Sequence, residues 1–376
     1  MKLTSDMIKE RAKELGLDCV GIGSIDRYSE APPLMSPKNY FPGCRSVIVV
    51  AMRIPRGSYR GIEEGTHWHN YTYYSYNRLN TVIRPRLTYQ LATFIEDFGW
   101  EAVPCYPAVP ERNPAREPVA EGKLPSDVVM QIRIMGVGAG VGEMGHSKVF
   151  LTPKFGPRVR LGMILTDCEL EPDPIIDPGT ICNHCGCCVR ECPGNAIPPV
   201  NDKDKLIHIN VGEKDIYWGD VHMGRCTLTH HGQNNKISPF HKAAFPNMEF
   251  DVDNSHMTEE EAYRISYPLA TAKWTDALWE HSDPYVIKFY NYVMNHVGYF
   301  ALCGARGCIR ACMMNLEKNG IIENKFKNEF RYKPAWLLPN KIEETQGTIN
   351  PFRERYLDEL DPELRHNEQN GMLFNE

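Results

Sequence analysis

The sequence predicts a mixed α/β protein, in which a core of alternating helices and strands is followed by a module that is dense in cysteine. Helical and strand patterns alternate over residues 5–166, as in α/β and α+β cores. The Pro-containing stretch 171–179 then indicates a linker, and most of the thirteen cysteines come after it. The expected domains are a core over 1–170, a cysteine module over 171–320 with a long insertion between Cys226 and Cys303, and a C-terminal extension over 321–376.

The first elements of the core follow from local patterns. Residues 5–16 are expected to form an amphipathic helix, with Ser5 as its cap and Gly16 as its stop. A short strand is expected at 18–22. The run SVIVVAM at 46–52 is continuously apolar and rich in β-branched residues, which is typical of a strand that is covered on both faces.

A second helix and three more strands complete the predicted core. Apolar residues follow helical spacing over 77–98, Gly99 supplies the C-terminal stop, and Pro85 marks a kink or the true start. The further strands are expected at 101–104, 149–152 and 159–166.

Composition and charge limit the classes of protein to which the chain can belong. Its 42% of hydrophobic and 24% of charged residues are ordinary for a globular protein. The net charge of -6 gives no general electrostatic reason to bind nucleic acid or an anionic membrane. The start MKLTSDMIKERAKELG lacks the apolar core of a signal peptide, and no apolar run is long enough for a membrane span. We therefore expect a cytoplasmic protein without a membrane span or a nucleic-acid partner.

The cysteines point to metal ligation, because disulfides are rare in the reducing cytoplasm. Cys182, Cys185, Cys188 and Cys192 follow the spacing C-x2-C-x2-C-x3-C and precede Pro193. This run is typical of bacterial ferredoxins, in which three thiolates bind one 4Fe-4S cluster and the fourth binds a second cluster. A zinc ribbon is the alternative, but its two C-x2-C pairs match the sequence less well than the ferredoxin run does.

The second cluster requires three further ligands, and the first requires one cysteine from elsewhere. The late segment CGARGCIRAC contains three cysteines, and the solitary Cys226 precedes it. Cys303 stands farther from Cys308 than the ferredoxin spacing requires, so Cys187 stays open as an alternative ligand. We predict one cluster on Cys182, Cys185, Cys188 and Cys312, and the other on Cys192, Cys226, Cys303 and Cys308.

Three features together resemble the corrinoid-dependent iron–sulfur reductases, which include reductive dehalogenases and epoxyqueuosine reductase. They are the segment GVGAGVGEMGHSKVFLTPKFGPRVRLGMILTD at 136–167, the apolar strand at 46–52 and the doubled cysteine motif. The resemblance implies a nitroreductase-like core that binds cobalamin and a ferredoxin-like module with two 4Fe-4S clusters. Such clusters are suitable low-potential electron donors to cobalt.

The resemblance also implies which residues bind cobalamin. Glycines within 136–167 would let the backbone approach the cofactor closely, although the same pattern fits a tight loop without a ligand. The stretch GDVHMG at 219–224 misses by one residue the D-x-H-x-x-G spacing that supplies an axial histidine. We therefore interpret His222 as a loop residue and expect base-off cobalamin. The expected cofactor-binding residues are Gly138, Gly140, Gly142, Gly145, His146, Thr152 and His69.

An aromatic run at 66–78 supplies candidate catalytic groups. Reductive cleavage leaves a negatively charged fragment, and a tyrosine can protonate it when a cation stabilises the phenolate. Arg78, or a cation from elsewhere in the chain, would have that role. For any single tyrosine, packing against the cofactor or the core is the alternative. The candidate acids are Tyr71, Tyr73, Tyr74, Tyr76 and Tyr106.

Two features distinguish the chain from epoxyqueuosine reductases. Cys105 and Tyr106 stand where that family has a catalytic aspartate, although Asp127 or Glu143 is a possible substitute. The tail 341–376 carries more acidic than basic residues, which disfavours tRNA binding.

We therefore expect a cobalamin-dependent reductase that is similar to reductive dehalogenases and cleaves a carbon–heteroatom bond of a small organic substrate. A ferredoxin or flavodoxin would donate the electrons. The alternatives are an electron-transfer protein that serves a separate corrinoid protein or reductase, and an epoxyqueuosine reductase that acts on tRNA.

Overall fold

The structure is a computed structural model, and it describes residues 2–106, 117–125, 129–238, 241, 248–271, 301–331 and 334–338. Of His69 and 267–271 it describes the backbone alone. Met1–Trp336 form one compact unit and Leu337–Glu376 form a second. The domain limits expected near residues 170 and 320 both fall within the first unit, and they stay a prediction.

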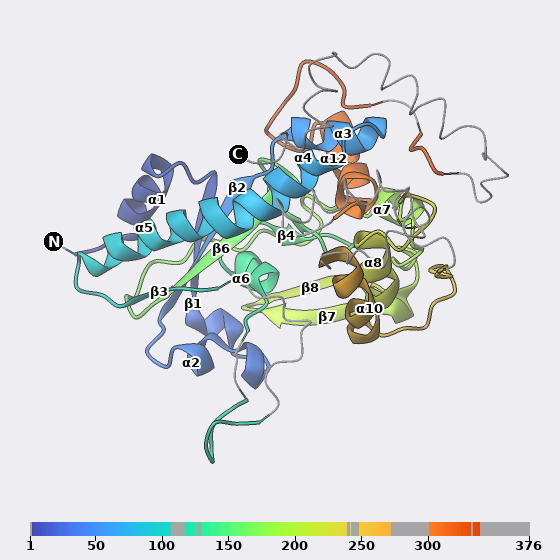
Figure 1. The fold of residues 1–376 in the computed structure, drawn as a ribbon. Helices are drawn as coiled ribbons and strands as arrows, with labels where there is room; N and C mark the ends of the chain where they lie inside the picture. Colours follow the sequence, from blue (N-terminus) through green and yellow to red (C-terminus); the bar gives the residue numbers. More distant parts are fainter. Residues whose placement is uncertain are drawn as a thin grey trace, which may run out of the picture. The chain divides into compact units, whose positions relative to one another are not determined.

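A four-stranded sheet forms the centre of the first unit (Figure 1). Every pairing within it is antiparallel, so the alternation of helices and strands along the chain produces an α+β arrangement rather than a parallel sheet. The expectation of a mixed α/β fold is confirmed. The strand order is β1 (Cys19–Ser24), β2 (Ser46–Arg53), β6 (Val159–Thr166) and β3 (Ala102–Pro104).

Strand β2 is covered on both faces, as its continuous apolar run predicted. Ile48 and Val50 belong to one hydrophobic core with residues of α1 and α5, whereas Val47 and Val49 belong to a second core with residues of α6. This division follows from the alternation of side chains along a strand. The helices are α1 (Ser5–Glu14), α5 (Arg84–Glu96) and α6 (Ile132–Gly138).

The cap of α1 is Thr4, whose Oγ1 accepts a hydrogen bond from the amide of Met7 at 3.3 Å. The prediction of Ser5 as the cap is wrong, because Ser5 is already helical and its hydroxyl donates to the carbonyl of Glu171 at 2.8 Å. Gly16 adopts a φ of 86°, the left-handed conformation that commonly ends a helix.

The helix predicted over 77–98 begins earlier and includes the aromatic run. α4 (His69–Thr72) continues into two π-helical segments, η4 (Tyr73–Asn77) and η5 (Leu79–Ile83), and then into α5. Pro85 stands in the first turn of α5, where a proline is tolerated best. The tyrosines therefore lie on one continuous but irregular helical scaffold.

The cysteine module contains short helices and a β-hairpin that the sequence patterns did not predict. The hairpin consists of β7 (Leu206–Val211) and β8 (Lys214–Gly219). Before the module, a smaller antiparallel pair joins β4 (Glu143–Met144) to β5 (Phe150–Leu151), which lies within the strand expected at 149–152. Among the described residues, no helix has both the length and the apolar character that crossing a membrane requires. The other helices used below are α3 (Arg60–Glu64), α7 (Cys187–Arg190), α8 (Met223–His230), α10 (Glu259–Thr271), η8 (Cys303–Ala305) and α12 (Cys308–Lys318).

Candidate functional site

Four cysteines from two distant segments meet around one small cavity. Cys182 and Cys185 precede α7, Cys188 lies in α7, and Cys312 lies in α12. All four line this cavity together with His146, whose backbone amide donates to Cys182 Sγ at 3.4 Å. The structure thus brings together the four cysteines predicted for one cluster, which we call cluster A.

The other four predicted ligands form a second group, which we call cluster B. Cys192 follows α7, Cys226 lies in α8, and Cys303 and Cys308 begin η8 and α12. The thiol of Cys303 interacts electrostatically with the other three thiols. The amide of Ala196 donates to Cys192 Sγ at 3.3 Å. That these eight cysteines hold two 4Fe-4S clusters stays a prediction.

Cys188 and Cys226, one from each group, keep their protons at neutral pH unless a metal displaces them. Burial, followed by the neighbouring cysteines, raises the pKa of Cys188 and of Cys226 to about 12. Because the thiolate is the form that binds metal, loading must displace these protons. Within the described part of the chain, no group of three or more His, Cys, Asp or Glu is arranged to hold one metal ion.

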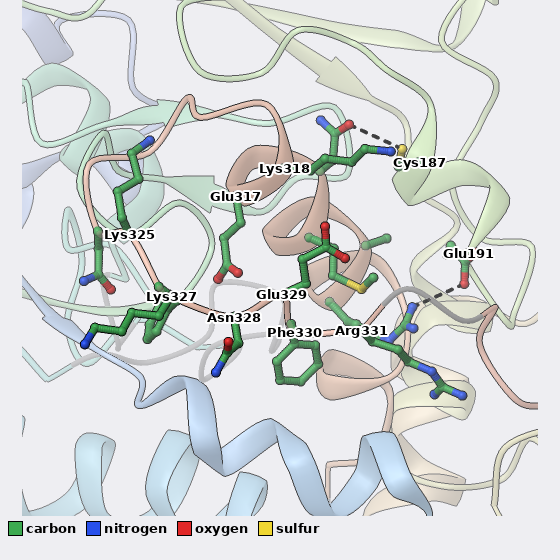
Figure 2. A pocket seen from close by; sticks show the side chains of 16 residues that line it. Cys187, Glu191, Glu317, Lys318, Lys325, Lys327, Asn328, Glu329, Phe330 and Arg331 are labelled. Carbon is green, nitrogen blue, oxygen red and sulfur yellow. Dashed lines mark hydrogen bonds and ion pairs between the residues drawn. The ribbon is translucent and has the colours of Figure 1, made fainter.

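Cys187 lines a different cavity from the four thiols of cluster A. This second cavity measures about 570 Å³ and lies between α12 and residues 324–331, with charged side chains around it (Figure 2). Cys187 Sγ accepts a hydrogen bond from Arg190 Nη2 at 3.1 Å and lies 3.8 Å from Asn315 Oδ1. None of the candidate tyrosines lines this cavity, so it is separate from the expected catalytic site.

The different surroundings of Cys303 and Cys187 lead to a test of cluster B. We expect Cys303→Ser to lower the iron content of anaerobically purified protein from about eight to about four per chain, because one cubane loses a ligand. Cys187→Ser is the matched control and should keep about eight iron. Iron and acid-labile sulfide assays distinguish the two variants. Iron loss in Cys187→Ser, with full iron retention in Cys303→Ser, would instead assign Cys187 and not Cys303 as a ligand of cluster B.

Glu143 orients the loop that carries cluster A. It is buried in β4, and its Oε1 accepts hydrogen bonds from the amides of Ile181, at 3.1 Å, and of Cys182. Burial raises the pKa of this carboxyl despite the amide donors. Because its carboxylate accepts hydrogen bonds from the cysteine loop, Glu143 is not placed to act as the substitute for a catalytic aspartate. Asp127, the other suggested substitute, lies outside the described residues.

Tyr71 and Tyr76 lie next to one cation, Arg160. The ring centroids of Tyr71 and Tyr76 are 5.9 Å apart, and Cζ of Arg160, from β6, lies 4.1 Å from the centroid of Tyr76. Burial alone would lower the pKa of Arg160, but its interactions with the tyrosines raise it, so the guanidinium stays charged. Arg160 is therefore the cation that lies beside Tyr76, and a catalytic role for it stays a prediction.

Tyr71 and Tyr76 differ in their access to other molecules. Tyr71 is fully buried, which raises its pKa well above 10, and a Cβ at Gly304 would collide with its hydroxyl. Tyr76 is half-buried, and its ring centroid lies 5.5 Å from that of His230. Burial, then His231 and Arg160, lower the pKa of His230 well below its usual value, so this imidazole is neutral. Tyr76 is thus the better placed proton donor.

The remaining tyrosine candidates lie away from this group. Tyr74 is 47% exposed and Tyr106 is 84% exposed. Tyr73 is half-buried, and Arg78 Cζ lies 4.7 Å from its ring centroid. Because Tyr73 is itself a candidate acid, the expectation that Arg78 supports a catalytic phenolate stays a prediction.

Sequence reasoning missed Arg160 and His230 as members of the site. Arg160 lies in the segment 136–167 that the sequence analysis singled out, and His230 lies four residues after the predicted ligand Cys226. The useful signal was a charged residue within an otherwise apolar strand, since such a residue requires a partner.

The glycine-rich segment packs tightly against the protein itself. A Cβ at Gly138 would collide with Tyr28, and one at Gly142 would collide with the backbone of β5. Gly140 has a φ of 72°, which favours glycine. These contacts correspond to the tight-loop alternative, and contact of these glycines and of Gly145 with a cofactor stays a prediction.

His146 and Thr152 are also engaged within the protein. His146 is buried beside cluster A, and its Nε2 lies 2.9 Å from the carbonyl oxygen of Pro198. Thr152 Oγ1 accepts a hydrogen bond from the amide of Phe155 at 3.2 Å. The side chain of His69 lies outside the described residues. Cofactor contacts of all three stay a prediction.

Comparison with known proteins identifies two groups of relatives. The chain is 31% identical over 122 residues to a tetrachloroethene reductive dehalogenase of Dehalobacter restrictus, a match that covers 32% of this chain and 18% of that protein. It is 26% identical over 229 residues to the epoxyqueuosine reductase of Staphylococcus aureus, which covers 52% of each. The chain thus spans about half or less of these relatives. No protein-family model matches it. The resemblance to both groups is confirmed.

The relatives named epoxyqueuosine reductase bear on the expected partners. An epoxyqueuosine reductase with an epoxyqueuosine-modified tRNA-Tyr stem loop matches with a TM-score of 0.37 and 16% identity, over 78% of this chain and 81% of that chain. The sequence match to an epoxyqueuosine reductase overturns the expectation of no nucleic-acid partner. That expectation rested on net charge, whereas nucleic-acid binding depends on the local arrangement of cations.

Proposed function

We propose that this relative of reductive dehalogenases and epoxyqueuosine reductases is a cobalamin-dependent reductase with two 4Fe-4S clusters. One observation carries the proposal. Tyr76 and Arg160 lie next to Tyr71, which packs against the turn that contains Cys303 and Gly304. A proton donor, a cation and a cluster ligand therefore meet in one place, as reductive cleavage of a carbon–heteroatom bond requires.

The exposure of the two cysteine groups supports an order of electron transfer. Cys185 of cluster A is exposed, whereas Cys303 of cluster B is buried in the same hydrophobic core as Tyr71. The groups adjoin, because Cys308 interacts electrostatically with Cys188. Electrons would enter at cluster A and leave from cluster B.

Cobalamin would bind at the edge formed by Tyr76, Arg160 and His230, which are partly exposed polar groups beside cluster B. When bound there, it supplies a low-potential metal that accepts single electrons from a cluster. The proposed base-off state rests on the spacing of residues 219–224. His222 is the N-cap of α8, where its Nδ1 accepts the amide of Arg225 at 3.4 Å.

The chain's own residues would supply the proton. The hydroxyl of Tyr76 donates to the negative charge that develops on the substrate, and the Arg160 guanidinium stabilises the phenolate that remains. Tyr71 stays protonated because burial raises its pKa, so it holds Tyr76 in place rather than competing as an anion.

We expect anaerobically purified protein to contain about eight iron, about eight acid-labile sulfide and, after loading, about one cobalamin per chain. Elemental analysis and visible absorbance measure these contents. The cobalt(II) electron paramagnetic resonance spectrum should lack nitrogen splitting from an axial imidazole. Protein with full cluster content that binds no cobalamin would favour the electron-transfer alternative.

The names of the relatives suggest two substrates for the first assays, tetrachloroethene and an epoxyqueuosine-modified tRNA stem loop. We propose the dehalogenase-like reaction, because Cys105 is buried, Tyr106 is exposed, and neither supplies a carboxylic acid at the position where epoxyqueuosine reductases have one. Chloride release from tetrachloroethene would support this reaction, whereas reduction of the modified stem loop alone would establish the tRNA-directed one.

A further inference from the structure

Ser75 lies at the centre of the π-helical segment η4 and links the tyrosine helix to Arg160. Its side chain is fully buried, and its Oγ donates a hydrogen bond to the carbonyl of Tyr71. Its own carbonyl accepts a hydrogen bond from Arg160 Nε at 2.7 Å. One residue therefore holds the local helix geometry and the cation at the same time.

The same helix is bonded on another side to the turn of cluster B. Thr72 Oγ1 donates to the carbonyl of Ala301 at 3.1 Å and accepts from its amide at 3.4 Å. Ala301 stands two residues before Cys303. The segment from Thr72 to Ser75 thus connects the cluster turn to Arg160 through direct hydrogen bonds.

The π turn also explains how Tyr71 and Tyr76 reach the same cation. Residues five apart point about 140° away from each other on an α-helix with 3.6 residues per turn. A π turn contains more residues, which brings such positions closer to one face. The 5.9 Å between the ring centroids of the two tyrosines agrees with this geometry.

We propose that Ser75 is a positioning residue, which maintains the π turn and thereby holds Arg160 over Tyr76. Without the Ser75 hydroxyl, the Tyr71 carbonyl can accept the amide four residues later, as in an α-helix. The turn would then tighten, and the carbonyl that faces Arg160 would rotate away. The expected effect of Ser75 on catalysis rests on the proposed function, whereas its effect on the position of Arg160 does not.

Thr81 provides a matched control for the variant Ser75→Ala. In the next π-helical segment, Thr81 Oγ1 donates to the carbonyl of Asn77 at 2.6 Å, which is the same type of bond. Thr81 is exposed, and among the described residues Arg160 forms hydrogen bonds with Ser75, Val159 and Tyr71. Thr81→Ala therefore removes a similar hydrogen bond and leaves the hydrogen bonds of Arg160 unchanged.

The first readout is structural and needs no substrate. In crystal structures of the cluster-loaded variants, the 4.1 Å distance from Arg160 Cζ to the Tyr76 centroid should increase in Ser75→Ala and stay unchanged in Thr81→Ala. Ser75→Thr keeps a hydroxyl that can make the same bond and should preserve the distance. If Ser75→Ala loses its clusters, Ser75→Cys replaces it, because the thiol is similar in size but a weak donor.

The second readout is kinetic, with tetrachloroethene and the epoxyqueuosine-modified stem loop as probes. We expect Ser75→Ala to lower kcat about tenfold with KM changed less than about twofold, because a misplaced cation affects the transition state more than binding. Thr81→Ala should match the wild type. An unmoved Arg160 in Ser75→Ala would overturn the role of Ser75. A wild type that reduces neither probe would overturn the proposed function, and the crystal structures would still decide the role of Ser75.

Discussion

Replacing Tyr76 by Phe is expected to lower turnover by about a hundredfold or more, while iron and cobalamin contents stay unchanged. The variant keeps the ring that Arg160 covers at 4.1 Å and removes only the hydroxyl. Tyr71, the other tyrosine beside Arg160, is fully buried, so among the described candidate acids the variant removes the partly exposed donor beside this cation. Steady-state rates with tetrachloroethene and with the modified stem loop measure the effect.

Tyr74→Phe is the matched control for this prediction. Tyr74 lies two residues earlier in the same π-helical segment, but its side chain is 47% exposed. We expect this variant to retain full turnover. Equal rates in both variants would show that Tyr76 is not the acid, and Tyr71→Phe would then be the next test. A large loss in Tyr74→Phe with none in Tyr76→Phe would contradict the assignment directly.

The two cysteine groups could be predicted from the sequence, because the spacing of the cysteines along the chain indicates which of them bind a cluster. Four cysteines in one short run define most of a cubane, and the shortage of ligands then requires the late segment that contains Cys303, Cys308 and Cys312. The structure brings the members of each predicted set together. Cys303 illustrates the limit of the spacing rule, since the turn η8 absorbs the extra residues before Cys308.

The catalytic arrangement was less accessible, because it depends on contacts between distant segments. Tyr76 meets Arg160 only after β6 pairs with β2 and the helix is placed over the sheet. The π turns that direct the tyrosines have no simple residue pattern, so the run predicted aromatic residues at the site without indicating which of them would converge. Similarly, helical and strand periodicity predicted the elements of the core but not their antiparallel pairing.

The last prediction concerns the buried ion pairs that hold α12, the helix that contributes to both clusters. Glu63 is fully buried and accepts hydrogen bonds from Arg310 Nη2 at 3.0 Å and from Arg331 Nη1 at 2.7 Å, in addition to one from Arg310 Nε. Arg310 is also buried and stands between the ligands Cys308 and Cys312. Glu63 thus fixes the part of α12 on which both cysteine groups depend.

We expect Glu63→Gln to lower the free energy of unfolding by about 3–5 kcal/mol, because it leaves Arg310 and Arg331 buried or partly buried without their shared carboxylate. Glutamine has nearly the same shape, so the loss reports charge rather than packing. Glu260→Gln is the control, since Glu260 pairs with Arg264 on the exposed face of α10 and should cost less than about 1 kcal/mol. Urea unfolding of the anaerobic, cluster-loaded protein, followed by visible absorbance, compares the two variants. If the urea midpoint of Glu63→Gln equalled that of Glu260→Gln, solvent or another group would compensate the charge of Arg310. Glu63 would then not hold α12.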